Sequence, residues 1–428
     1  MSSPYKTFSC FTFGCKVNFA DTSMIARQLI DLGCSHVNDN TNADICIINT
    51  CSVTDLADKK AQKLIKKINQ NSPESKIIVT GCYAQLKPEE ISAIKGVDFV
   101  IGADEKLNFK NYLLDDFSTN VKAGNIEDVI KFKPSYSLNE RTRAFLKIQD
   151  GCSYNCTYCT IPMARGISRS GTIKETVDLI EKIIIKDIKE VVLSGINIGD
   201  FGIQHNQNLN MLIKELENIK NLVRYRISSI EPNLINHELV DLFYHSKKWA
   251  RHLHIPLQSG SNKILNKMKR RYKVEDYIKL IENLKNKFPN ICLGVDVIVG
   301  FPGESEKDFM KTYKMLENLE VSYLHVFSYS ERDSTLAAQY DNKVQKIETK
   351  RRRKKLQELS DILFAKFINK NIGQIQSVLF QKYEDGLLSG ISDNYLKVYV
   401  PGKKQYVNKI FNVELLRYDN FIFGKLID

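Results

Sequence analysis

The sequence predicts an α/β protein made of an N-terminal doubly wound α/β domain, a central partial (β/α)6 barrel and a small C-terminal antiparallel β-barrel. Three observations support this division. The 428 residues exceed the length of one ordinary domain. Strand-like and helix-like segments alternate over most of the chain, as in parallel sheets. The last part changes to short alternating runs broken by Gly, Asp and Asn. The predicted parts are 5–118, a linker at 119–142, 143–368 and 371–428.

The first region alternates apolar strands with amphipathic helices. Residues 43–50, ADICIINT, form an almost continuous apolar run, which is typical of a buried parallel strand. The helix predicted over 17–33 ends at Gly33, a residue suited to a helix C-cap. Further strands are predicted at 6–14, 75–81 and 97–102, and a second helix at 54–70. This order is typical of a doubly wound sheet.

The second region repeats the rhythm with six predicted strands. They cover 144–150, 190–195, 223–230, 251–257, 291–300 and 322–329, with helices between them such as 173–188 and 304–320, and a closing helix at 347–371. Six parallel strands with helical crossovers suit a partial barrel whose active site lies at the carboxyl ends of the strands. The polar segment 119–142 that precedes them is interpreted as a linker or an ordered extension.

The third region has the turn-broken pattern of a small β-barrel. Lys397, Tyr399, Lys403, Lys404 and Tyr406 interleave basic and aromatic side chains. This composition suits contacts with an RNA backbone and stacking on bases. Aromatic residues that merely fill a small barrel explain it equally well.

The net charge and the number of cysteines limit the kinds of function that the protein can have. A net charge of +12 favours a polyanionic partner, most often nucleic acid, although many basic proteins bind none. No stretch reaches the roughly 18 apolar residues of a membrane span, and the first residues lack the pattern of a signal peptide. We therefore expect a cytoplasmic protein without a membrane partner. Ten cysteines in that reducing compartment indicate metal or redox chemistry rather than structural bridges.

Cys152, Cys156 and Cys159 have the spacing C-x3-C-x2-C directly after the first barrel strand. A structural zinc site needs a fourth ligand, usually in a second close pair, and no second CxxC exists. Disulfide exchange needs only two thiols. Three thiolates on one tight loop suit a cubane iron–sulfur cluster, because they bind three irons and leave the fourth open for another molecule.

Three further cysteines, Cys15, Cys51 and Cys82, each follow a predicted strand of the first region. Since the carboxyl ends of parallel strands share one edge of a sheet, these thiols are expected to converge. Coincidence among ten cysteines is the alternative. The remaining four are interpreted as packing residues: Cys10, Cys34, Cys46 and Cys292.

The loop DGCSYNCTYCTIPMARG resembles the signature of radical S-adenosylmethionine (SAM) enzymes, and VVLSGINIGD and DVIVGFPGES resemble their SAM-contacting strand ends. The resemblance implies that the open iron binds SAM and that one-electron reduction cleaves it to a 5′-deoxyadenosyl radical. The SAM contacts expected from it are Tyr158, Gly195, Glu231, Gln258 and Gly300. Ser259 beside Gln258 is a further possible contact, or else a satisfied polar residue of the loop.

The whole chain more closely resembles the methylthiotransferases of that superfamily, through GCKVNFADT, NTCSVTDLADKK, GCYAQ, LHIPLQSGS and GFPGE. This implies that Cys15, Cys51 and Cys82 hold a second [4Fe-4S] cluster and that the C-terminal barrel is an RNA-binding TRAM domain. Two SAM molecules would serve as methyl donor and radical source. The resemblance further implies that the radical abstracts the hydrogen at C2 of an adenine and that a methylthio group replaces it. Acid–base groups and nucleophiles do not attack such a C–H bond. No catalytic residue is assigned outside the clusters.

GCKVN and NTCSVT resemble the branch that methylthiolates N6-threonylcarbamoyladenosine (t6A) beside the anticodon, whereas other branches usually read GCQMN or GCPKN. Expected partners are the tRNA anticodon stem-loop and an electron donor such as flavodoxin or ferredoxin, with the enzyme a monomer. The alternatives are isopentenyladenosine in tRNA, a ribosomal-protein aspartate, or a non-catalytic iron–sulfur RNA-binding protein. Two roles stay open: Arg165 guides the cofactor or orients the cluster loop, and the basic runs 267–273 and 350–355 contact phosphates or only solvent.

Overall fold

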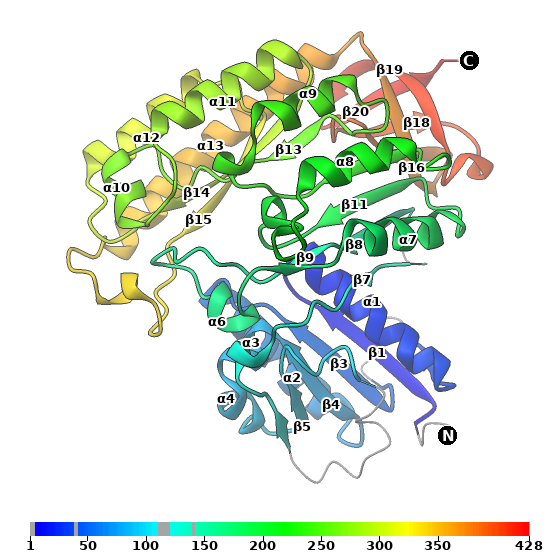
Figure 1. The fold of residues 1–428 in the computed structure, drawn as a ribbon, viewed down its shortest axis with the longest axis vertical. Coiled ribbons are helices and arrows are strands. Elements are labelled where there is room, and N and C mark those ends of the chain that lie inside the picture. The colour runs from blue at the N-terminus through cyan, green and yellow to red at the C-terminus, as the bar shows by residue number, and fades with distance from the viewer. Residues whose placement is uncertain (1–4, 38–41, 110–119, 139–141, 428) are drawn as a thin grey trace.

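The computed structural model describes residues 5–37, 42–109, 120–138 and 142–427. Figure 1 shows three bodies in chain order. The N-terminal domain, in blue and cyan, lies below the green and yellow barrel, and the C-terminal barrel, in red, lies at the far end. No helix of the described residues is both long and apolar enough to cross a membrane.

The N-terminal domain is a parallel sheet of six strands in the order β2-β1-β3-β4-β5-β6. Its strands are β1 (Thr7–Thr12), β2 (Ser35–His36), β3 (Ile45–Thr50), β4 (Lys76–Gly81), β5 (Val97–Ile101) and β6 (Val121–Lys122); its helices are α1 (Lys16–Asp31), α2 (Asp55–Asn71), α3 (Cys82–Leu86) and α4 (Pro88–Ser92). Helix α1 covers one face, where Ile45 and Ile47 of β3 are buried. Helices α2 and α4 cover the other face, over Cys46 and Ile48. The predicted doubly wound domain is confirmed.

The central domain is an open barrel of six parallel strands. They are β8 (Arg143–Lys147), β11 (Glu190–Ser194), β12 (Arg224–Ile227), β13 (His252–His254), β14 (Cys292–Val299) and β15 (Tyr323–Ser328). Strands β12, β11 and β8 form one hydrogen-bonded sheet and β13, β14 and β15 another. Isolated parallel bridges, Tyr225 to Trp249 and Ser229 to His254, join the two sheets between β12 and β13. The predicted partial (β/α)6 barrel is confirmed.

Helices surround this barrel on the outside. They are α7 (Ile173–Ile184), α8 (Leu209–Asn218), α9 (His237–His245), α10 (Asn262–Lys267), α11 (Val274–Lys287), α12 (Glu306–Asn318) and α13 (Lys346–Asn371). The short α6 (Ile161–Arg165) instead packs on α3 of the N-terminal domain. Alternate strand residues such as Leu146, Val191 and Tyr225 pack in the large core beneath the surrounding helices. Because successive side chains of a strand point to opposite faces, the intervening residues Glu190 and Arg226 face the interior.

The N-terminal domain packs along the open edge of the barrel. Helix α1 contacts β7 (Ser135–Tyr136) and β8, and the ring centroids of Phe19 and Phe145 are 6.4 Å apart. Within the predicted linker 119–142, β6 pairs with β5 of the first sheet and β7 pairs with β8 of the barrel. Residues 119 and 139–141 of that segment lie outside the described residues.

The C-terminal part is a closed barrel in the order β16-β17-β18-β20-β19. Its strands are β16 (Ile375–Glu384), β17 (Leu387–Ser392), β18 (Lys397–Pro401), β19 (Ile410–Asp419) and β20 (Phe421–Leu426). The pairs are antiparallel as predicted, except that β18 and β20 close the barrel in parallel. The turn after β17 caps the amino end of the central barrel, where Arg226 donates to the carbonyls of Ser392 and Asp393 at 3.1 and 3.0 Å.

Candidate active site

The loop with Cys152, Cys156 and Cys159 lies at the carboxyl end of the barrel, between β9 (Gln149–Asp150) and α6. Its folding is local. The backbone N–H of Cys152 donates to Gly166 O and that of Cys159 to Cys156 O, both at 3.0 Å. Gly151 has φ +69°, and a Cβ there would lie 2.0 Å from the carbonyl oxygen of Ile167. Glycine is therefore required where the strand turns into the loop.

The other three cysteines come together at the carboxyl edge of the N-terminal sheet. Cys15 is the N-cap of α1, Cys51 follows β3 directly, and Cys82 begins α3 directly after β4. The charges of Cys82 and Cys15 both act on the Cys51 thiol. Gly14 makes room for this approach, because a Cβ there would be 2.7 Å from Cys51 Cβ. The sheet edge thus gathers the three thiols as its topology predicts.

The two cysteine sets face each other across the contact between domains. Helix α3, which begins at Cys82, packs on α6, which follows Cys159. The hydroxyl of Thr160 donates to the carbonyl of Ser52 at 3.4 Å, so the residues that follow Cys159 and Cys51 touch. Both sets therefore border one interdomain space.

Arg165 spans this contact. Its Nη1 donates to Asp150 Oδ1 of the barrel at 2.7 Å, its Nη2 to Asn18 Oδ1 of α1, and its Nε to Cys82 Sγ at 3.3 Å. The side chain is only 2% exposed. Asp21 and Asp150 anchor the surrounding cations, and the Arg165 charge helps hold the pKa of both carboxyls below the usual range against the opposing effect of burial. Arg165 thus ties the loop of Cys152, Cys156 and Cys159 to the N-terminal domain.

Arg270 plays the matching part at the loop cysteines. Its Nη1 donates to Cys156 Sγ at 3.3 Å, and its Nη2 pairs with the carboxylate of Glu231. Its neighbour Arg271 lies over the ring of Tyr154, 3.7 Å from the centroid. Within the basic run 267–273, Arg270 is therefore committed to the surroundings of the cysteine loop, whereas Lys269, Arg271 and Lys273 are exposed.

The second basic run is also partly internal. Arg352 is buried and pairs with Glu304 at 2.7 Å, while Arg351 pairs with Glu306 at 2.6 Å. Glu304 in turn accepts from the backbone N–H of Gly300 at 2.7 Å, which fixes the turn in the GFPGE segment. Lys350, Arg353, Lys354 and Lys355 remain on the outside of α13 as the solvent-facing part of the run 350–355.

The thiols suit a soft metal group better than disulfide exchange. Burial raises the pKa of Cys51, Cys152 and Cys159 to about 12. Such thiols stay protonated at neutral pH, whereas exchange catalysts need a lowered pKa, and a bound metal displaces the proton. Among the described residues, which include all ten cysteines, no group of three or more His, Cys, Asp or Glu side chains is arranged to hold a metal ion. A [4Fe-4S] cluster differs, because each thiolate binds a separate iron of a larger group.

The donor chemistry fits that larger group. Each set offers three thiols and one buried arginine that donates to a sulfur, Arg165 at Cys82 and Arg270 at Cys156. Hydrogen bonds to the sulfurs and positive charge nearby are among the features that tune iron–sulfur clusters.

A cavity of about 180 Å³ opens beside Cys159. Tyr158, Gln258 and Asp296 line it from the barrel, and Val53 and Thr54 line it from the N-terminal domain. Gln258 has φ +65°, an uncommon conformation for a residue with a side chain, which its backbone bonds to β14 hold in place. Strain of this kind is frequent where ligands bind. The structure thus brings Tyr158 and Gln258 together at one cavity.

The other residues expected to contact SAM have partners within the protein. Glu231 pairs with Arg270. A Cβ on Gly195 would lie 2.8 Å from Gln149 Oε1, and one on Gly300 would lie 2.4 Å from Thr349 Oγ1. Both glycines are thus already required by packing. Ser259 is buried and its hydroxyl accepts from the backbone N–H of Ser261.

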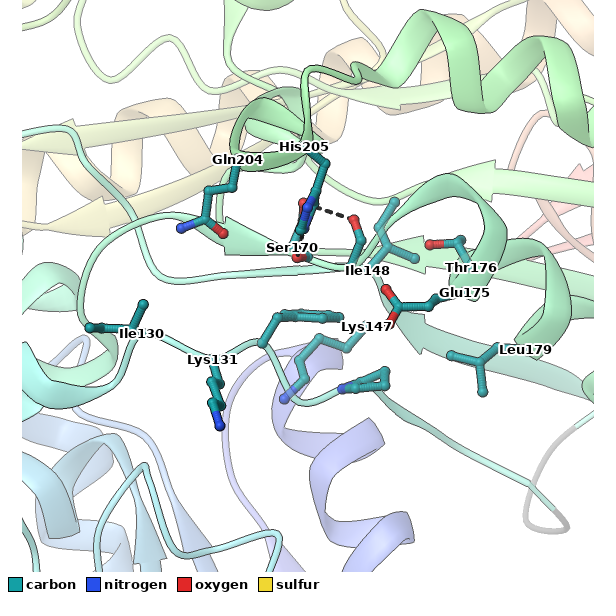
Figure 2. A pocket seen from close by; sticks show the side chains of 13 residues that line it. Ile130, Lys131, Lys147, Ile148, Ser170, Glu175, Thr176, Leu179, Gln204 and His205 are labelled. Atoms are coloured by element: carbon teal, nitrogen blue, oxygen red, sulfur yellow. Dashed lines mark hydrogen bonds between the residues drawn. The ribbon is translucent and has the colours of Figure 1, made fainter.

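A larger cavity, of about 480 Å³, lies outside the barrel near α7. Figure 2 shows its lining, with Lys147 reaching toward α1, where it donates to Asp21 Oδ1 at 2.7 Å. His205 bonds the carbonyl of Ser170 at 3.1 Å. No cysteine lines this cavity, and Lys147 already pairs with Asp21, so the smaller cavity beside Cys159 is the better candidate for the active site.

The interior of the barrel is strongly charged. Glu190 of β11 accepts from Arg226 Nε at 3.0 Å, and its carboxylate also forms ion pairs with Arg224 Nε at 2.7 Å and Arg143 Nη1 at 3.4 Å. These cations hold the pKa of Glu190 well below its usual range despite burial. Lys16 at the start of α1 lies among these groups, and burial followed by the charges of Arg226 and Arg143 lowers its pKa to about 8.

Sequence reasoning missed the groups that link the two cysteine sets. Arg270 lies over a hundred residues from Cys156, and Asn18 and Asp21 lie on a helix of another domain. Only Asp150 carried a local signal, because it directly precedes the glycine and cysteine that open the loop.

Comparison with known proteins agrees with this geometry. The chain matches the uncharacterized protein family UPF0004 over residues 7–102 and the radical SAM superfamily over residues 146–316. It is 36% identical to a threonylcarbamoyladenosine tRNA methylthiotransferase of Bacillus subtilis, covering 96% of this chain and 94% of that one. It is 32% identical to a tRNA-2-methylthio-N(6)-dimethylallyladenosine synthase of Endomicrobium trichonymphae, covering 97% and 99%.

A solved structure shows the same fold. The radical SAM methyltransferase TsrM of Kitasatospora setae superposes with a TM-score of 0.57 at 14% identity, over 79% of this chain and 77% of that one. The two matched family regions contain the two cysteine sets, and the similarity to the Bacillus enzyme extends over nearly the whole chain. The chain therefore belongs to the radical SAM methylthiotransferase family.

Proposed function

We propose that this enzyme methylthiolates C2 of N6-threonylcarbamoyladenosine next to the anticodon of tRNA, giving 2-methylthio-N6-threonylcarbamoyladenosine. It would use two [4Fe-4S] clusters and two SAM molecules. One observation carries the proposal: two sets of three cysteines from different domains border one interdomain space, where Thr160 touches Ser52 and Arg165 reaches Cys82. A group on one set can therefore act on a molecule held against the other.

Each set of residues has a distinct task in this proposal. Cys152, Cys156 and Cys159 would hold the SAM-cleaving cluster, and Cys15, Cys51 and Cys82 the sulfur-carrying cluster. When bound, these clusters supply one-electron cleavage of SAM and the sulfur for transfer. Tyr158 and Gln258 line the cavity beside Cys159 and would position SAM there. Glu231, Gly195 and Gly300 stay proposed SAM contacts through their places at the strand ends.

The choice of substrate rests on similarity and on the barrel interior. The Bacillus subtilis relative named for threonylcarbamoyladenosine is more similar, at 36% identity, than the dimethylallyladenosine relative at 32%. The interior next to Cys15 is charged, with Lys16, Arg143, Glu190 and Arg226. A threonylcarbamoyl group is polar and carries a carboxylate that can pair with Lys16, whereas an isopentenyl group is apolar and offers this ammonium group no partner.

Binding to tRNA would use the C-terminal barrel and the outer face of α13. Lys397 lies 5.0 Å from the ring centroid of Tyr399, and Tyr399 contacts Phe421, a half-exposed ring of β20. A surface of this composition suits RNA. A donor such as flavodoxin or ferredoxin would supply the electron.

The test is mass spectrometry of nucleosides from tRNA of cells that lack their own methylthiotransferases, with and without this gene. We expect 2-methylthio-N6-threonylcarbamoyladenosine to appear only with the gene. The isopentenyl analogue in its place would keep the chemistry and overturn the substrate. No new nucleoside, with iron incorporation confirmed, would favour the ribosomal-protein aspartate or a non-catalytic RNA-binding role.

A further inference from the structure

Lys16 lies among the charged groups of the barrel interior. It is the first residue of α1, directly after Cys15, and it is only partly exposed. Among the residues that the structure describes, its ammonium group has neither a hydrogen bond nor an ion pair. This sets it apart from Lys106 and Lys147, the buried lysines nearby, which both pair with Asp21.

The nearest carboxylate cannot serve as its partner. Glu190 and the Cys15 thiol are the acidic groups that act on Lys16. Glu190 already binds Arg224, Arg226 and Arg143, and Cys15 is a proposed cluster ligand. Arg226 and Arg143 in turn repel the ammonium. The cations around Glu190 therefore exceed the negative charge that is available to them.

The other carboxylates near Lys16 already pair with other residues. Asp296 of β14 accepts from His254 Nε2 at 2.8 Å. Asp393, from the C-terminal barrel, pairs with Arg251 at 2.7 Å. His252 and His325, on β13 and β15, feel the Lys16 charge and bring no negative charge of their own. No described carboxylate on the surrounding strands is thus free for Lys16.

Three separate effects oppose a cation at this point. The group is largely withdrawn from water, it lies beside two guanidinium groups, and it stands at the positive end of a 16-residue helix whose first turn has no acidic residue. A charged group that is kept in so unfavourable an environment is often found at a functional position. An anion bound beside Lys16 would relieve all three effects.

We propose that Lys16 binds the carboxylate on the N6 substituent of the substrate. The inference rests on the proposed function, since the threonylcarbamoyl group ends in a carboxylate. C2 and N6 of adenine lie on the same edge of the ring, because C2 and C6, the carbon that carries N6, both flank N1. When C2 faces the group held by Cys15, the N6 substituent therefore lies near the residue that follows Cys15. Lys16 is then a specificity-determining residue for a known class of reaction.

The test compares two RNAs on the reconstituted wild-type enzyme. One anticodon stem-loop carries t6A, and the other carries its carboxamide, which keeps the shape and loses the charge. We expect the carboxamide RNA to bind about 10- to 100-fold more weakly in fluorescence anisotropy, as for loss of a charge-assisted hydrogen bond. Equal binding by the wild-type enzyme overturns the inference without any variant.

Variants of the enzyme test whether Lys16 causes the difference in binding between the two RNAs. K16Q should bind the two RNAs equally, and K16R should keep most of the discrimination. K63Q, an exposed lysine on α2, should behave as wild type. Iron content and cluster absorbance establish that each variant is loaded. If K16Q weakens both RNAs to the same degree, Lys16 contacts a phosphate and the inference is wrong.

The same samples separate this inference from the proposed function. If the wild-type enzyme forms no 2-methylthio product on t6A RNA, the proposed function fails. If it forms that product and modifies the carboxamide RNA with the same KM, the function stands and only the role of Lys16 is refuted.

Discussion

The two ends of the central barrel handle buried charge in different ways. At the amino end, Glu190 binds three arginines, and Arg226 also donates to two carbonyls of the turn after β17. At the carboxyl end, buried arginines donate to cysteine sulfurs. The amino end is an arrangement of protein partners that holds the C-terminal barrel in place. At the carboxyl end, the arginines instead donate to cysteine thiols, which are proposed to bind the clusters.

This difference predicts that substitutions at the carboxyl end mainly reduce SAM cleavage or product formation. Substitutions at the amino end should mainly reduce the stability of the fold. The following variants test that division, from the largest expected effect to the smallest.

The largest effects are expected at the cysteines. Cys156→Ala should abolish cleavage of SAM, because the loop cluster loses one of three ligands. Cys82→Ala should preserve formation of 5′-deoxyadenosine and stop formation of the methylthio product, with about four irons retained per chain. Liquid chromatography of the nucleosides together with iron analysis measures both. Methylthio product from Cys82→Ala would refute the two-cluster proposal.

Arg165→Met should reduce both product formation and thermal stability, because this side chain joins the two domains. The substitution removes the closest ion-pair partner of Asp150. Breaking a buried ion pair typically lowers the free energy of unfolding by about 3–5 kcal/mol. We expect a large fall in the thermal midpoint of the apo-protein and loss of methylthio product. Arg353→Met, on the exposed face of α13, is the control. An unchanged midpoint for Arg165→Met would show that the domains hold together without this link.

Arg226→Met should lower stability while sparing the cleavage of SAM by the protein that remains folded. It removes the guanidinium that bonds both oxygens of Glu190, again at a cost of about 3–5 kcal/mol. Thermal unfolding and 5′-deoxyadenosine formation per folded chain measure the two effects. Loss of SAM cleavage without loss of stability would contradict the division between the two ends.

The smallest effect concerns pH. Burial, followed by the charges of Arg226 and Lys16, holds the pKa of His252 well below its usual value near 6.5. The folded protein keeps this ring neutral, whereas the unfolded chain takes up a proton below about pH 6.5. Stability is therefore fully present above that pH and falls by up to about 1.4 kcal/mol per pH unit below it.

Urea unfolding of the apo-protein between pH 5 and 7 measures this slope. His252→Phe should reduce it, and part should remain because the pKa of His325 is also lowered. Carboxyls with lowered pKa, such as Glu190, contribute only below about pH 4.5, outside this window. An undiminished slope in His252→Phe would place the titrating group elsewhere.

Much of the fold was predictable because it depends on local patterns. The run at 43–50 contains the buried strand β3, and Gly33 follows the end of α1 with φ +89°. Leu56 shows the limit of such reasoning. The apolar periodicity of the helix predicted over 54–70 places it on one side with Leu64, Ile65 and Ile68, yet it is 60% exposed. The parallel pairing of β18 with β20 was likewise invisible, because alternation predicts strands but not their partners.

The sequence by itself determined which residues can do the chemistry. Three cysteines within eight positions, and three more at predicted strand ends, are visible because their spacing is local or follows from the order of strands. Only the tertiary structure decided what surrounds them. Arg165 at Cys82, Arg270 at Cys156 and the charged groups around Lys16 depend on contacts between segments far apart in the chain. Such contacts follow from packing of whole domains, and no local pattern of residue types records them.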